Sequence, residues 1–164
     1  MLIAIGGMPG VGKTTVAREL AGRLRAAHLR IDALEAALVT TGLVRAGADV
    51  GPVGYELALA VADSCLAAGT DVVVDAVFPI AISREPWTAL AQRHGIPIYW
   101  VRLVCADPAE HRRRVEERAA DLPGHVVPDW TAVVGRETDE WLEPHAVVDT
   151  ADGDPVSAVE ALLG

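Results

Sequence analysis

The sequence predicts an α/β domain in which a parallel β-sheet carries helices on both faces. Short apolar runs alternate with segments of helical periodicity along the whole chain. These runs are apolar at successive positions, as in strands that are covered from two sides. In addition, a glycine-rich stretch, Gly7–Thr14, separates the first apolar run from the first helical segment. Strand, tight loop and helix therefore follow one another at the start of the chain.

The predicted strands are short apolar runs, several of them rich in β-branched residues. They are Leu2–Ile5, His28–Ile31, Asp71–Asp75, Ile98–Val104 and Ala146–Asp149. Helical spacing predicts helices over about residues 13–24, 33–38, 52–68, 84–94, 108–118, 130–141 and 155–163. Asp107, followed by Pro108, is typical of a helix N-terminus, because aspartate caps the first amides and proline fits the first turn.

Length and composition indicate one domain with a sizeable core. We expect a single domain over residues 1–164, of which 51% are hydrophobic. The formal net charge of −9 argues against a broad nucleic-acid surface. The first apolar run is too short for a signal peptide, and no run approaches a membrane span. We therefore expect a cytoplasmic protein with no nucleic-acid or membrane partner, in which Cys65 and Cys105 are reduced thiols.

The stretch Gly7–Thr14 fits the phosphate-loop pattern G-x-x-x-x-G-K-[ST]. In this pattern backbone amides surround the phosphates of a nucleotide, the lysine reaches the β- and γ-phosphates, and the hydroxyl binds Mg²⁺. Lys13 is the one lysine among 14 lysines and arginines, which suits a compact ammonium inside a ring of amides. The sequence therefore predicts ATP and Mg²⁺ as cofactors. The predicted nucleotide contacts in and after the loop are Gly7, Gly10, Val11, Gly12, Lys13, Thr14 and Thr15.

Residues outside the loop narrow the class of nucleotide-binding protein. The chain contains no asparagine and no second lysine, so it lacks the Asn-Lys-x-Asp type of motif by which GTPases recognise their base. Asp75, at the end of a predicted strand, is followed by Ala76 and not by a water-activating glutamate. These two observations favour transfer of the γ-phosphoryl group to an acceptor other than water.

The order of the motifs resembles the small P-loop kinases of metabolites and antibiotics, such as chloramphenicol phosphotransferase, gluconate kinase and shikimate kinase. The shared pieces are Gly7–Thr14, an aspartate after the second strand, Val-Val-Val-Asp at the third, Arg-Val-Glu-Glu-Arg before a lid, and Val-Val-Asp-Thr near the end. The resemblance implies a five-stranded sheet in the order 2-3-1-4-5 and a lid at about residues 119–129. It also implies ATP-dependent transfer of a phosphoryl group to a hydroxyl of a small molecule.

Two aspartates are candidates for the chemistry. By the resemblance, Asp32 accepts the proton of the attacking hydroxyl; its alternative is an N-cap of the helix that begins at Ala33. Asp75 follows the strand expected beside the first one, where a carboxylate holds the Mg²⁺ shell together with Thr14. A substrate contact or an ordinary strand-end turn is the alternative for Asp75.

Arg114 and Arg118 are four residues apart and share one helix face. Their spacing resembles the lid arginines of adenylate kinase and its relatives. This implies that Arg114 stacks on adenine and that Arg118 reaches the transferring phosphoryl group. The alternative is a solvated charge run at the end of a helix. Thr150 and Asp152 would lie near the adenine by the same resemblance, or form an ordinary turn.

The acceptor is expected to bind between Asp32 and Tyr55 and at the loop after Asp75. The candidate contacts are Asp32, Thr41, Tyr55, Phe78 and Arg84. For Arg84 the alternative is simple exposure to solvent. A kinase of nucleosides, nucleotides or nucleic-acid ends, and a nucleotide-binding regulatory module without transfer activity, remain alternative functions. The sequence indicates no particular oligomeric state.

Overall fold

The computed structural model describes residues 1–45, 47–48, 50–124 and 126–164. Ala46 and Asp49, in the predicted acceptor stretch, and His125, in the predicted lid, lie outside the described residues. The strands are β1 (Leu2–Gly6), β2 (Ala27–Arg30), β3 (Val72–Asp75), β4 (Ile98–Val104) and β5 (His145–Asp149). The helices are α1 (Lys13–Leu24), α2 (Ile31–Thr40), α3 (Val53–Ala67), α4 (Ala81–His94), α5 (Pro108–Glu117), α6 (Trp130–Val134) and α7 (Pro155–Ala161).

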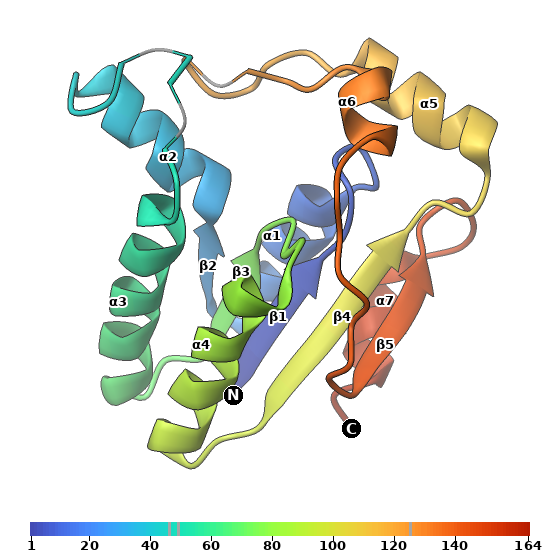
Figure 1. The fold of residues 1–164 in the computed structure, drawn as a ribbon. Helices are drawn as coiled ribbons and strands as arrows, with labels where there is room; N and C mark the ends of the chain where they lie inside the picture. The colour runs from blue at the N-terminus through green and yellow to red at the C-terminus, as the bar shows by residue number, and fades with distance from the viewer. Residues whose placement is uncertain (46, 49, 125) are drawn as a thin grey trace.

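The five strands form one parallel sheet in the order β2-β3-β1-β4-β5, which confirms the predicted fold (Figure 1). All five residues of β1 are buried, because it lies at the centre between β3 and β4. Since every strand runs the same way, the carboxyl ends of β1, β2 and β3 meet at one edge. This edge is where open α/β sheets bind their ligands.

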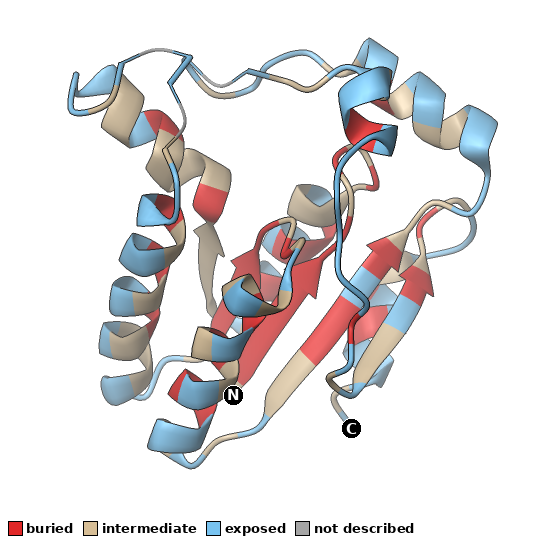
Figure 2. Ribbon diagram, viewed as in Figure 1, coloured by how far each residue is buried: buried red, intermediate tan, exposed pale blue. Residues whose placement is uncertain are grey.

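A hydrophobic core lies on each face of the sheet. Leu2 and Ala4 of β1 face the core that contains Trp87 and Leu90 of α4 and small residues of α3. Ile3 and Ile5 face the opposite core, which α1 and α7 complete. The alternation of β1 side chains between two cores explains why the strand reads as a continuous apolar run. Figure 2 shows buried central strands and exposed outer helix faces. Among the described residues, no helix is long and apolar enough to cross a membrane.

Two helices begin earlier than predicted. Helix α2 begins at Ile31, so Asp32 lies in its first turn and the predicted N-cap role is wrong; Arg30 occupies the cap position. Helix α4 begins at Ala81, because the Asp139 carboxylate accepts the amide of Ala81 at 2.9 Å and satisfies a donor of the first turn. Such a long-range cap leaves no local signal in the sequence.

The predicted helix over 130–141 is also shorter in the structure. Helix α6 ends at Val134, and Gly135 is its C-cap. Trp141 lies beyond the helix and packs edge-on against Trp100 of β4, with ring centroids 5.6 Å apart. The described part of the lid segment, 119–129, arches from the end of α5 towards α2 and returns to α6 (Figure 1). A Cβ at Gly124 would lie 3.0 Å from Val39 Cγ1, so the lid segment contacts α2.

Candidate active site

The glycines of the phosphate loop are required by backbone conformation and by close packing. Gly7, Gly10 and Gly12 have φ angles of 138°, 86° and 92°, which L side chains rarely adopt. A Cβ at Gly7 would lie 2.3 Å from the carbonyl oxygen of Leu103, and one at Gly10 would lie 2.4 Å from Val115 Cγ2. No side chain caps α1, whose N-terminus opens directly from Gly12. The loop therefore presents backbone amides, the arrangement that binds phosphate.

Lys13 lies under this loop with carboxylates nearby. Its Nζ donates a hydrogen bond to the Met8 carbonyl at 2.9 Å. Burial lowers the pKa of Lys13, and the charges of Asp75 and Asp32 act in the opposite direction. These two aspartates therefore lie close enough to act on the lysine, although they come from β3 and α2. The sheet edge has brought the predicted base and the predicted metal carboxylate to the phosphate loop.

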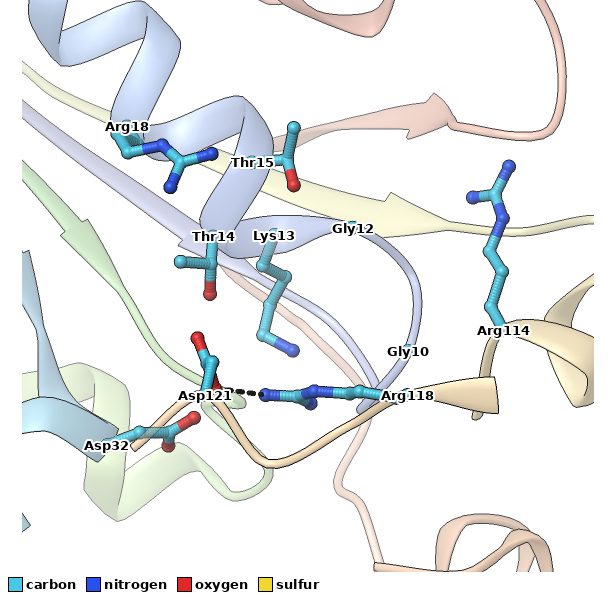
Figure 3. Close-up of a pocket in the computed structure, with 10 residues that line it drawn as sticks. All are labelled: Gly10, Gly12, Lys13, Thr14, Thr15, Arg18, Asp32, Arg114, Arg118 and Asp121. Carbon is cyan, nitrogen blue, oxygen red and sulfur yellow. Dashed lines mark ion pairs between the residues drawn. The ribbon is translucent and has the colours of Figure 1, made fainter. Parts of the chain in front are cut away.

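A cavity of about 360 Å³ opens over the loop (Figure 3). Its lining includes all three predicted catalytic residues, Lys13, Asp32 and Arg118, which point into the same space. The complete lining is Gly10, Gly12, Lys13, Thr14, Thr15, Arg18, Asp32, Arg114, Arg118 and Asp121. Several cationic side chains in one concave site suit a polyanionic ligand on a chain whose net charge is −9.

Asp75 does not line this cavity, but its charge acts on Lys13 and it fits the role of a metal-shell carboxylate. It is 2% exposed and pairs in register with Ile5 of β1. Its Oδ2 has no hydrogen-bond partner within the described part of the chain, and His28 Nε2 lies 3.8 Å away. A buried carboxylate oxygen without a donor is costly unless a cation or an ordered water completes its surroundings. The donor set of Asp75 and the Thr14 hydroxyl suits Mg²⁺, which prefers oxygen ligands and retains water.

The arginines of α5 divide into two groups. Arg112 and Arg113 point outward and pair with glutamates of their own helix, as a solvated charge run would. Arg114 is half-buried and donates to Glu110 Oε1 at 2.7 Å and to the Thr150 hydroxyl and carbonyl, both at 3.0 Å. Arg118 follows the last residue of the helix and reaches the cavity. Arg112 and Arg113 therefore belong to a solvated charge run, whereas Arg114 and Arg118 face the cavity.

Thr150 connects the phosphate loop with the end of β5. Its buried hydroxyl donates to the Val11 carbonyl at 2.8 Å and accepts from Arg114. Neither Val11 nor Thr150 is among the residues that line the cavity. Asp152 is exposed in the next turn, outside the cavity lining. We therefore regard Val11 and Thr150 as residues that hold the loop and Arg114 in place.

Of the predicted acceptor residues, Asp32 lines this cavity, whereas Thr41, Tyr55, Phe78 and Arg84 do not. Thr41 is exposed at the end of α2, and its hydroxyl donates to the Ala37 carbonyl at 2.8 Å. The Tyr55 hydroxyl accepts the amide of Phe78 at 3.3 Å, and burial raises the pKa of Tyr55 to about 12. Phe78 is fully buried and packs edge-on against Trp87 and other aromatic rings. Tyr55 and Phe78 thus belong to the core beside the sheet edge.

Arg84 is buried and fully engaged, so it neither faces an acceptor nor points into solvent as the sequence suggested. Its side chain is 1% exposed, and Nε donates to Glu143 Oε1 at 2.7 Å. Nη1 donates to the Phe78 carbonyl at 3.1 Å and Nη2 to the Glu140 carbonyl at 3.0 Å. The guanidinium also lies 5.1 Å from the ring centre of Trp141. Arg84 therefore ties the loop after β3 to residues 140–143, and we assign it no substrate.

Three residues of the site were not identified from the sequence. Arg18 and Asp121 line the cavity over the phosphate loop, which we call the nucleotide cavity. Arg136 lines a second cavity, and its charge acts on Lys13 and on Tyr55. Arg18 was recoverable in principle, because it lies one helical turn after Thr14. Asp121 and Arg136 lie in irregular segments before and after α6, where residue spacing carries no signal.

The second cavity, of about 450 Å³, lies between α2 and the lid segment. Small and apolar residues dominate its lining, with Glu35 and Arg136 as the charged ones. The lining is Glu35, Ala36, Val39, Gly47, Ala48, Val50, Gly51, Gly124, Val126 and Arg136. Because α2 contributes Asp32 to the first cavity and Glu35 to the second, one helix borders both.

Comparison with known proteins places this site in a family. A family model described as an AAA domain matches residues 2–136. Among curated proteins, none matches the sequence. A provisionally assigned kinase from Chloroflexus aurantiacus superposes with a TM-score of 0.78 at 22% identity, covering 99% of this chain and 96% of that one. A gluconokinase from Sinorhizobium meliloti has a TM-score of 0.65 at 22% identity, covering 98% and 91%.

A third structure, Chaetomium thermophilum Kti12 in complex with ADP-AlF3, has a TM-score of 0.69 at 21% identity and covers 100% of both chains. At these identities the likeness shows a shared fold. The family match covers most of the chain and includes the phosphate loop. The chain belongs to this AAA domain family and has the nucleotide-binding fold of the P-loop kinases.

Proposed function

We propose that the protein is an ATP-dependent phosphotransferase that moves the γ-phosphoryl group to a hydroxyl of a small molecule. The observation that carries this proposal is the nucleotide cavity, which Lys13, Asp32 and Arg118 line together. Phosphoryl transfer requires a cation that binds phosphate, a carboxylate that can accept a proton, and an arginine that stabilises the transferring group. They come from three separate elements, so their convergence is a property of the fold.

The chemistry assigns each group one task. The loop amides and Lys13 bind the β- and γ-phosphates, while Arg114 and the end of β5 border the nucleoside side. The acceptor oxygen attacks the γ-phosphorus, the bond from that phosphorus to the bridging oxygen breaks, and ADP leaves. Asp32 takes the proton from the acceptor hydroxyl. Arg118 stabilises the charge that develops on the transferring group.

Thr14 and Asp75 are the residues that would hold Mg²⁺. When bound, the ion would neutralise part of the phosphate charge and orient the phosphate oxygens. The buried, unpartnered oxygen of Asp75 supports this assignment.

The second cavity is the acceptor site that we propose. Its side chains are mostly alanine and valine, but backbone groups, Glu35 and Arg136 make more of its surface polar than apolar. This favours a small hydroxylated metabolite or natural product with polar and apolar parts, an antibiotic included. A nucleotide or nucleic-acid end would need several cations, whereas Arg136 is the single arginine among the described lining residues.

Ala76 argues against a dedicated ATPase. It follows Asp75 and is 4% exposed, in the position where such enzymes carry a glutamate that activates water. A regulatory module without transfer activity would instead show slow hydrolysis that no acceptor stimulates.

A screen of hydroxyl-bearing compounds for acceptor-dependent ADP release tests the proposal. We expect hits among small hydroxylated compounds with polar and apolar parts, and none with a Lys13→Ala variant. Hydrolysis that no compound accelerates would contradict the transferase assignment and favour the regulatory alternative. Stimulation by nucleosides or nucleic-acid ends alone would instead contradict the acceptor class.

A further inference from the structure

A carboxylate from the lid segment lies in the nucleotide cavity between two arginines. Asp121 accepts hydrogen bonds from Arg30 Nη1 at 2.5 Å and from Arg30 Nη2 at 3.0 Å. Arg118 Nη2 lies 3.8 Å from Asp121 Oδ1 (Figure 3). Asp121 therefore joins the end of β2 to the arginine that we place at the transferring phosphoryl group.

The two ion pairs differ in strength. Arg30 binds Asp121 with both terminal nitrogens, a geometry that gives strong, directional pairs. Its side chain is 11% exposed and extends from the last residue of β2, opposite Asp75 in the sheet. Arg118 makes one longer contact at a more exposed place, and such pairs contribute little. Arg30 is thus the fixed partner of Asp121, and Arg118 is the partner that can exchange.

Arg30 also connects the lid segment with the proposed base. Its Nη2 lies 3.7 Å from Asp32 Oδ2, so one guanidinium contacts the carboxylates of the lid and of α2. The hydrogen bonds from Arg30 are the main reason that the pKa of Asp121 falls to about 2, so Asp121 remains ionised at neutral pH. Because Arg30 neutralises Asp121, a triphosphate can enter beside this carboxylate without facing an uncompensated negative charge.

We propose that Asp121 is a positioning residue, which together with Arg30 fixes the start of the lid segment. Arg118 then exchanges its ion pair with Asp121 for a contact with the transferring phosphoryl group. This inference rests on the proposed function. A γ-phosphoryl group carries more charge than a carboxylate and attracts Arg118 away from its weaker pair, while Arg30 retains Asp121. Loss of the Asp121 carboxylate should therefore weaken stabilisation of the transition state and leave binding of the ground-state nucleotide nearly unchanged.

Binding of Mg-ADP with and without aluminium fluoride tests this without knowledge of the acceptor. Aluminium fluoride mimics the transferring phosphoryl group, so it should tighten binding of ADP to the wild-type protein. Titration calorimetry of Asp121→Asn should show that about tenfold or more of this tightening is lost, because a misplaced group forfeits its stabilisation. The affinity for ADP alone should remain within about twofold, since the phosphate loop is intact.

Matched variants separate positioning from general effects. Glu117→Gln, next to Arg118, removes the same charge from an exposed pair with Arg113 and should behave as wild type. Asp121→Glu should restore most of the tightening. Arg30→Gln should match Asp121→Asn, and the double variant should be no worse, because the two residues act as a unit. In an Arg118→Ala background, Asp121→Asn should have no further effect.

Four results would overturn the inference. Full tightening in Asp121→Asn would show that the carboxylate does not position Arg118. Equal weakening with and without aluminium fluoride would show a general structural role. Additive losses in the Arg30→Gln and Asp121→Asn pair would show that the residues act separately. A wild-type protein that binds ADP but does not tighten with aluminium fluoride would contradict the proposed phosphoryl transfer itself, and the positioning role with it.

Discussion

Replacing Arg84 by methionine separates its observed structural role from the substrate role that the sequence suggested. The change keeps an unbranched side chain of similar length but removes the cation. Three donors are lost: those to the Glu143 carboxylate and to the Phe78 and Glu140 carbonyls. Glu143 Oε2 already lacks a partner within the described residues, so its carboxylate would become an uncompensated, mostly buried charge.

Removal of one partner of a buried ion pair costs about 3–5 kcal/mol, which sets the expected loss in free energy of unfolding. For a domain of this size that corresponds to a decrease in Tm of roughly 6–20 °C. Urea unfolding followed by tryptophan fluorescence suits the measurement, because Trp141 packs on Arg84 and Trp87 is buried nearby. Arg93→Met, an exposed arginine of the same helix, should change stability by less than about 0.5 kcal/mol.

Acceptor binding should not change in the Arg84→Met variant. At a temperature where Arg84→Met remains folded, its KM for an acceptor should equal that of wild type, since the guanidinium binds the protein. A variant with wild-type unfolding and a raised acceptor KM would refute this account and restore Arg84 as a substrate residue. Glu143→Gln combined with Arg84→Met should recover part of the lost stability, because it removes the unpaired charge.

Three further predictions concern the site and its charges. Asp32→Asn should lower kcat about 10²- to 10⁴-fold with unchanged affinity for ATP in calorimetry, and undiminished turnover would exclude the base role. Arg118→Ala should lower kcat by about 10³-fold or more and change the KM for ATP far less; equal changes in both would indicate a simple binding role. Stability should fall in acid: Arg30 lowers the pKa of Asp121 from 3.8 to about 2, and Arg113 and Arg114 lower the pKa of Glu110 from 4.5 to about 2. Because the folded state binds fewer protons there, their contribution is present above about pH 4.5 and is lost as the pH falls towards 2. Asp121→Asn should flatten part of this acid decline in urea midpoints, and an unchanged decline would contradict the Arg30 contact.

The parts of the molecule that the sequence predicted well depend on local patterns. The phosphate loop could be predicted because its glycines, lysine and threonine follow a fixed spacing within one short stretch, and the positive φ angles of Gly7, Gly10 and Gly12 agree with that pattern. The central strands β1 and β3 could be predicted because they are buried along their whole length and so read as apolar runs, whereas β2 is only partly buried and its sequence shows a weaker pattern. The strand order came from the resemblance to small P-loop kinases, and the structure confirms it.

The parts that the sequence missed depend on contacts between distant residues. Arg84 looked like a solitary arginine after a strand because its partner Glu143 is 59 residues away. Asp121 gave no signal because Arg30, which binds it, is 91 residues away in the chain. The early start of α4 has the same cause, since Asp139 supplies its cap from 58 residues away. The burial of these residues and the partners that they bind depend on the three-dimensional fold, and local residue spacing in the sequence does not reveal them.

Titration calorimetry of the purified protein with Mg-ATP tests the central claim most directly. The account predicts saturable binding at one site per chain and a loss of most of that affinity in Lys13→Ala, whose side chain lies under the phosphate loop. The absence of binding heat at any temperature, or equal affinity in wild type and Lys13→Ala, would contradict it.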